Sequence, residues 1–138
     1  MLKIQIANTE FEYLDALETE QFFNGSSRRT LTVTCAPNVI SVDTLNALLT
    51  EENLASVRLT NTEGIPVTVV DDMGQTVVDH YDPIVTIHEG YVLKLSCGIQ
   101  NMLVKAETPD SAAVYEDRLV FKMGKRTYIE QMLKGLGL

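Results

Sequence analysis

The chain has 138 residues and a formal net charge of −8, with 45% hydrophobic residues, 7% aromatic residues and no Trp. This length suits one domain over residues 1–138, which buries an ordinary core without metal ions or disulfide bonds. The negative charge repels phosphate backbones and argues against nucleic-acid binding. The low aromatic content argues against a surface built on base or sugar stacking.

The first ten residues, MLKIQIANTE, contain too short an apolar run for a signal peptide, and no segment is long and apolar enough to span a bilayer. We therefore expect a protein that begins in a cytoplasm and does not enter a membrane. Cys35 and Cys97 lie in apolar, strand-like segments and are expected to be reduced, buried thiols. A disulfide bond between them requires that their strands be neighbours.

The N-terminal third of the chain reads as strands separated by a turn. Residues 2–6 alternate apolar and polar side chains and predict a half-buried strand. Residues 11–17 fit either a strand or a short helical turn, and residues 22–27 predict a turn or flexible loop. Residues 29–35, RTLTVTC, alternate most strictly and predict the clearest strand.

In the middle of the chain the spacing of apolar residues changes once from that of a strand to that of a helix, and short strands then follow. Ser41 is a candidate cap for a short helix over residues 42–50, whose apolar residues share one helical face. Short strands follow at residues 56–60, 65–70, 75–81, 84–88, 91–97 and 102–106. A turn is expected at residues 61–64 and an interruption at Gly98. Hairpins are expected over residues 65–81 and 84–97.

The C-terminal part predicts a last strand at residues 118–123 and an amphipathic helix at residues 125–135. One face of that helix carries the apolar side chains of Tyr128, Ile129, Met132 and Leu133. A terminal helix of this kind usually packs on its own domain, and the alternative is docking to a partner. Because residues 107–114 form the weakest join, residues 107–138 are a candidate C-terminal arm or docking helix. The whole pattern predicts a mainly β fold, a β-sandwich or barrel with one inserted helix and a C-terminal helix.

Ligand-type side chains are densest in the middle of the chain. They are Asp71, Asp72, Asp79, His80, Asp82, His88 and Glu89. Their spacing matches no standard metal motif, and Asp residues in turns bond their own backbone, so we expect no metal ion or other cofactor. A nucleophile would require Cys35 or Cys97 beside His80 or His88, yet neither thiol lies in a basic loop. We therefore expect no catalytic residues and no enzyme activity.

Three segments resemble small structural proteins of tailed phages and prophages. They are residues 22–34 (FFNGSSRRTLTVT), 40–61 (ISVDTLNALLTEENLASVRLTN) and 115–125 (YEDRLVFKMGK). The resemblance implies a tail, baseplate or head–tail completion component that forms a homo-oligomer, such as a ring, and binds other virion proteins. Such a protein is made in the cytoplasm of the bacterial host and then enters the virion. The alternative function is a monomeric β-sandwich binding module or adaptor for a peptide or carbohydrate.

The predicted elements differ from that group in one respect, because no hairpin is long enough to grip a neighbour as tail-tube subunits do. The loops at residues 18–27 and 107–114 are expected to take its place. Open edge strands are pairing surfaces, and head-to-tail contacts between identical subunits close into rings when the rotation permits. The candidate partner-contact residues are Phe22, Phe23, Arg28, Arg29, Tyr128, Ile129 and Met132. We expect Arg28→Glu with Arg29→Glu to weaken self-association and to leave the fold intact.

Overall fold

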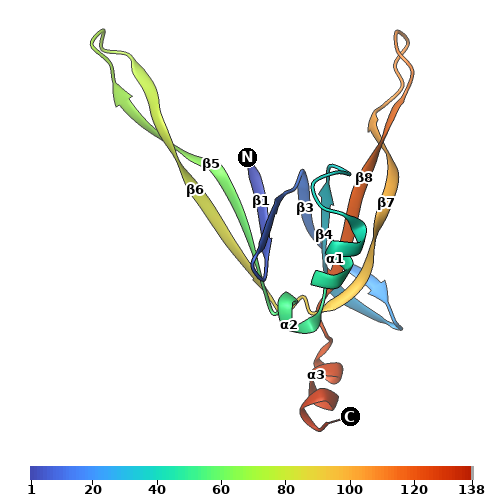
Figure 1. Cartoon of the computed structure of the whole chain (residues 1–138). Coiled ribbons are helices and arrows are strands. Elements are labelled where there is room, and N and C mark those ends of the chain that lie inside the picture. The colour runs from blue at the N-terminus through green and yellow to red at the C-terminus, as the bar shows by residue number, and fades with distance from the viewer. Residues whose placement is uncertain (138) are drawn as a thin grey trace.

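A computed structural model describes residues 1–137 of the chain (Figure 1). Within these residues the fold is mainly β, with two four-stranded antiparallel sheets packed together and three short helices. This architecture confirms the prediction of a β-sandwich. None of the helices described has both the length and the apolar character needed to cross a lipid bilayer.

The two sheets have the strand orders β2-β1-β5-β6 and β3-β4-β8-β7. The strands are β1 (Leu2–Ile6), β2 (Thr9–Glu12), β3 (Asp15–Phe23), β4 (Ser26–Cys35), β5 (Ser56–Val70), β6 (Thr76–Glu89), β7 (Leu93–Lys105) and β8 (Val114–Gly124). The helices are α1 (Val42–Leu48), α2 (Glu51–Leu54) and α3 (Tyr128–Gly135). Strands β6 and β7 are therefore edge strands, one in each sheet.

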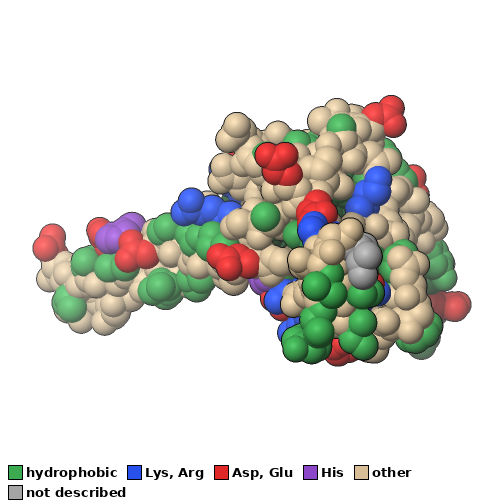
Figure 2. All heavy atoms as spheres, turned by 90° about the horizontal axis from the view of Figure 1, so that it is seen from below, with side chains coloured by type: hydrophobic (Ala, Val, Ile, Leu, Met, Phe, Trp, Pro, Cys, Tyr) green, Lys and Arg blue, Asp and Glu red, His purple; other side chains and the backbone are tan. Residues whose placement is uncertain are grey.

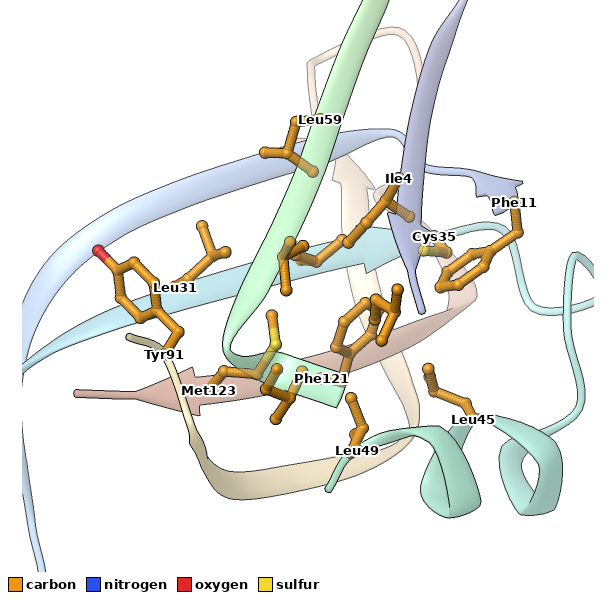
Figure 3. Packing of buried hydrophobic residues seen from close by; sticks show 14 of the residues in the cluster. Ile4, Phe11, Leu31, Cys35, Leu45, Leu49, Leu59, Tyr91, Phe121 and Met123 are labelled. Atoms are coloured by element: carbon orange, nitrogen blue, oxygen red, sulfur yellow. The ribbon is translucent and has the colours of Figure 1, made fainter. Parts of the chain in front are cut away.

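The hydrophobic core lies between the sheets at their shared end and is closed by α1 and α2 (Figure 3). Ile4 and Val33 project from the two facing sheets and are fully buried, while Leu45 of α1 covers them. Phe121 of β8 is also fully buried, and its ring centroid lies 6.1 Å from that of Phe11. The side chain of Ser41 caps α1 as predicted, whereas α2, capped by Thr50, was not predicted.

Two long hairpins extend beyond this core and diverge from each other (Figure 1). Strand β5 has 15 residues, which at about 3.3 Å per residue gives a length of about 50 Å. We call residues 61–84 the first arm and residues 100–118 the second arm. No residue of either arm is buried. The prediction that the chain lacks a long hairpin is therefore wrong.

The arms were not predicted from the sequence because two glycines inside long strands resemble the ends of strands. Residues 61–64 do not form a turn but an irregularity within β5, between Asn61 and Ile65. A Cβ on Gly64 would come within 2.4 Å of the side chain of Ile84, so glycine serves close cross-strand packing there. Gly98 likewise lies inside β7, opposite Val120.

The expected hairpin over residues 84–97 does not form. Strand β6 pairs only with β5, and β7 pairs with β8 in the other sheet. The chain crosses between the sheets at Gly90, whose φ of 82° suits a residue without a Cβ. Alternation alone does not distinguish a hairpin from a crossover of the same length, and tertiary pairing decided the outcome.

The two loops expected to act as arms have other structures. Residues 18–27 belong to the β3–β4 hairpin, whose turn is Asn24 (φ 51°) and Gly25 (φ 76°), the residue pair typical of a tight two-residue turn. Residues 107–114 lie at the tip of the second arm. Strand β8 pairs on both sides, so within residues 107–137 only α3 and the second arm project from the body.

Candidate functional site

Both arms carry large apolar side chains that are open to solvent. On the first arm these are Ile65, Val69, Val70, Met73, Val77, Val78, Tyr81 and Ile84. On the second arm they are Leu103, Val104, Val114 and Tyr115. Figure 2 shows the hydrophobic side chains that line the first arm outside the body. Apolar surface gathered in this way is typical of a protein–protein contact.

Two of the edge strands, β6 of one sheet and β7 of the other, differ in charge. Strand β6 contains Asp79, Asp82 and Glu89 and no Lys or Arg. Strand β7 contains Lys94 and Lys105 and no Asp or Glu. An exposed edge offers unpaired backbone groups to another chain, and opposite charges favour the pairing of these two edges.

Helix α3 stands at the end of the molecule opposite to the arm tips (Figure 1). It begins with a capping box, in which Thr127 and Glu130 each satisfy the other's backbone N–H. None of its residues is buried, and the exposed fractions of Tyr128 and Ile129 are 76% and 68%. The prediction that this helix packs its apolar face on its own domain is therefore wrong.

Ion pairs from the polar face hold α3 to the body instead. Glu130 accepts a hydrogen bond of 2.6 Å from Arg28 of β4, and Lys134 pairs with Glu51 of α2. Arg126, just before the helix, donates two hydrogen bonds of 2.8 and 2.7 Å to Glu51. At about 100° per residue, Glu130 and Lys134 lie on the face opposite to the apolar one, so the apolar face points away from the body.

Arg28 is the central group of this attachment. It is 2% exposed and donates hydrogen bonds to the backbone oxygens of Phe23 and Lys125 as well as to Glu130. These bonds from Arg28, together with the backbone hydrogen bond of the capping box, lower the pKa of Glu130 to about 2. Arg28 therefore joins the β3–β4 hairpin to α3 and is not free to contact a partner.

We predict that this ion pair makes stability depend on acid pH. Because the folded state lowers the pKa of Glu130, its contribution is complete above the ordinary value of 4.5 and is lost as the pH falls toward about 2. Glu130→Gln should therefore reduce stability at pH 7 and match the wild type near pH 2. Thermal unfolding across this range measures both proteins, with Glu107→Gln on an exposed tip as the control. A Glu130→Gln profile parallel to that of the wild type would contradict the prediction.

A cleft of about 400 Å³ lies between the sheets at the root of the first arm. Its apolar lining consists of Leu2, Tyr13, Ala16, Leu31, Leu59 and Ile84. Its polar lining includes Asp15 and Glu18 of β3, Arg29 of β4 and His88 of β6. The cleft thus combines apolar walls with two carboxylates, an arginine and a histidine.

Glu18 is surrounded by donors at the inner end of the cleft. The Tyr91 hydroxyl donates a hydrogen bond of 2.7 Å to Glu18, Arg29 donates another of 3.3 Å, and His88 Nδ1 lies 2.8 Å from its carboxylate. The bond from Tyr91 is the main cause of a lowered Glu18 pKa, while burial and Glu18 raise the pKa of Tyr91 to about 12. At neutral pH Glu18 is ionised and Tyr91 protonated, so the pair fixes the geometry rather than exchanging a proton.

The predicted contact residues do not share one surface. Phe22 is 77% exposed next to the β3–β4 turn, and Phe23 is half-buried. Arg29 pairs with Glu18, whereas Arg28 is buried against Glu130. Arg28→Glu would place a buried carboxylate beside Glu130 and disturb the fold, so the expectation that the double substitution leaves the fold intact is withdrawn. Tyr128, Ile129 and Met132 are exposed together on α3.

The acidic and histidine residues of the middle segment are dispersed. Asp71 accepts hydrogen bonds from its own turn, and His80 lies between Asp79 and Asp82 at 2.7 and 3.3 Å on the exposed first arm. The hydrogen bond with Asp79 is the main cause of a raised His80 pKa. Within residues 1–137, no group of three or more His, Cys, Asp or Glu side chains is arranged to hold a metal ion.

Neither cysteine has the environment of a nucleophile. Both thiols are free, and burial raises the pKa of Cys35 to about 12 and also raises that of Cys97. Their strands, β4 and β7, lie on opposite sides of β8. This places the two backbones about 10 Å apart, beyond the reach of a disulfide bond.

Sequence reasoning missed the Glu18 cluster and the attachment of α3. The T-x-x-E pattern at Thr127 and Glu130 is a capping-box signal and could have placed the start of α3. Nothing in the sequence links Glu130 to Arg28 or Glu18 to Tyr91, because these pairs are far apart in the chain. No protein-family model, curated protein or solved structure matches this chain.

Proposed function

We propose that this protein is a non-enzymatic assembly subunit of a phage or prophage virion, a tail, baseplate or head–tail joining component. It acts through contacts with copies of itself and with other virion proteins. It is made in the cytoplasm of the bacterial host and carries no cofactor. The observation that supports this proposal best is the pair of long hairpin arms, which expose apolar side chains and have no buried residue.

The edges of the sheets provide a route to a ring. Strands β6 and β7 are open edges of different sheets with opposite charge. Pairing of β6 of one copy with β7 of the next is a head-to-tail contact, and such contacts close into a ring when the rotation permits. The net charge of −8 would also keep DNA from adhering to the inner wall of a ring.

We predict that the protein self-associates and that the first arm contributes to this association. Val78→Asp with Tyr81→Asp places two carboxylates on side chains that are 46% and 48% exposed, so the monomer should fold normally. Burying these charges in an interface is unfavourable, and we expect at least about 10-fold weaker association. Light scattering and sedimentation over a concentration series measure the mass of wild type and variant.

The control is Leu14→Asp with Leu17→Asp, two residues that are 50% and 54% exposed outside the arms. This control should associate as the wild type does. A wild-type protein that stays strictly monomeric at every concentration would contradict self-assembly and favour the binding-module alternative.

The cleft at the root of the first arm supports that second candidate, a monomeric binding module for a peptide or carbohydrate. Its volume of about 400 Å³ and its mixed apolar and polar lining suit a short peptide segment. Titration of the monomer with a peptide library, followed by the chemical shifts of Tyr13 and Ile84, tests this function directly. The absence of any saturable shift would remove it.

A further inference from the structure

Helix α3 is amphipathic, but its orientation on the body is the reverse of that of an ordinary surface helix. A surface helix normally turns its apolar stripe to the core and its charges to water. Here Glu130 and Lys134 bind Arg28 and Glu51 of the body, and the apolar stripe faces outward. Because the polar side is already bound to its own chain, the apolar side is available only to another molecule.

The cleft between the sheets matches this apolar stripe in chemistry and in scale. It has walls of Leu2, Leu31 and Leu59 and a volume of about 400 Å³, enough for a few large side chains. We propose that the apolar face of α3, formed by Tyr128, Ile129 and Met132, docks into this cleft on a second copy of the chain. This inference rests on the proposed function and names the partner surface.

Charge complementarity favours a second copy over an unrelated partner. Residues 122–137, which contain α3, hold four basic residues and one acidic residue, namely Lys122, Lys125, Arg126, Lys134 and Glu130. The cleft itself is mixed in charge, because its lining holds Arg29 and His88, which pair with Glu18, as well as the carboxylate of Asp15. The first arm above it holds Glu63, Asp71, Asp72, Asp79 and Asp82 and no Lys or Arg. The basic end of the molecule thus complements the acidic first arm, while the apolar face of α3 complements the apolar walls of the cleft.

The contact is head-to-tail because its two surfaces are different. Each copy offers α3 at one end and the cleft between its sheets, so an open series of bound copies leaves one helix and one cleft unused at its two ends. Contacts of this kind continue in an open series unless the rotation closes them. The proposed docking therefore adds copies, or rings of copies, one after another.

The test compares the growth of wild type with that of two surface variants. Ile129→Ser with Met132→Ser removes the helix contact, and Ile84→Asp places a carboxylate in the apolar lining of the cleft. Each should weaken concentration-dependent growth by about 30-fold, the effect of removing central interface residues. Sedimentation velocity measures this growth, and circular dichroism confirms the fold of each variant.

Two matched controls should grow as the wild type does. Val85→Asp alters the residue next to Ile84, which is similarly exposed (40% against 44%) but does not line the cleft. Leu14→Ser with Leu17→Ser removes two exposed apolar side chains elsewhere. A one-to-one mixture of the helix variant and the Ile84→Asp variant should recover one contact, seen as a mixed complex that does not grow further.

Different outcomes separate the inference from the proposed function. If the wild type associates and the helix variant grows equally well, the docking of α3 is wrong and self-assembly stands. If the wild type never associates, both are wrong. Co-sedimentation with phosphatidylglycerol vesicles tests a lipid surface: wild-type binding that is lost in the helix variant, with unchanged growth, would overturn the proposal in favour of a membrane.

Discussion

Phe121→Ala is expected to lower the free energy of unfolding by about 4 kcal/mol, the usual cost of removing a buried aromatic ring from a packed core. Phe121 is fully buried in β8 and packs against Phe11. Urea denaturation followed by circular dichroism measures the change. An effect of this size would place this part of β8 inside the hydrophobic core.

The control lies in the same strand. Tyr115→Ala removes a side chain of similar size that is 58% exposed on the second arm, and it should change stability by no more than about 0.5 kcal/mol. If both substitutions destabilised the protein equally, the arm would have to be packed against something in the isolated chain. A large difference would show that β8 passes from the core into solvent.

Arg28→Ala is expected to lower the free energy of unfolding by about 3 kcal/mol, because it removes a buried guanidinium and several of its hydrogen bonds at once. The substitution removes donors from the backbone oxygens of Phe23 and Lys125 and releases Glu130. Arg29→Ala, one residue along the same strand, is the control. Its partner Glu18 keeps the hydrogen bond from Tyr91, and exposed ion pairs contribute little.

Hydrogen exchange gives a second measure of the Arg28 variant. The amides of α3 should lose protection in Arg28→Ala and keep it in Arg29→Ala, because of these two residues Arg28 contacts the helix and Arg29 does not. Unchanged protection of α3 in Arg28→Ala would show that Glu51 alone holds the helix. That result would contradict the central role given to Arg28.

The strands of the body were predictable from the sequence because apolar side chains that face the core alternate along them with polar side chains that face solvent. Strand β4 illustrates this, since Leu31, Val33 and Cys35 are buried between Thr residues. The arms were not predictable, because both faces of a projecting ribbon meet solvent and the alternation loses its meaning. Gly64 therefore read as a turn although it packs against Ile84.

The candidate surfaces were predicted only in part. The apolar stripe of α3 follows from helical spacing, and Tyr128, Ile129 and Met132 are exposed together. Its outward direction does not follow, because it depends on pairs such as Arg28 with Glu130, which are 102 residues apart. Arginine is seldom buried unless it is paired, so two adjacent arginines in a sequence predict an exposed surface.

The short connection at Tyr91 fixes the angle at which the two arms leave the body. Tyr91 lies between the ends of β6 and β7, is 1% exposed, bonds to Glu18 and lies beneath the ammonium of Lys125. Both ribbons thus leave the body from one connection that is buried and hydrogen-bonded. Under the proposed function, a subunit that is preorganised in this way would lose less conformational entropy when it joins an assembly.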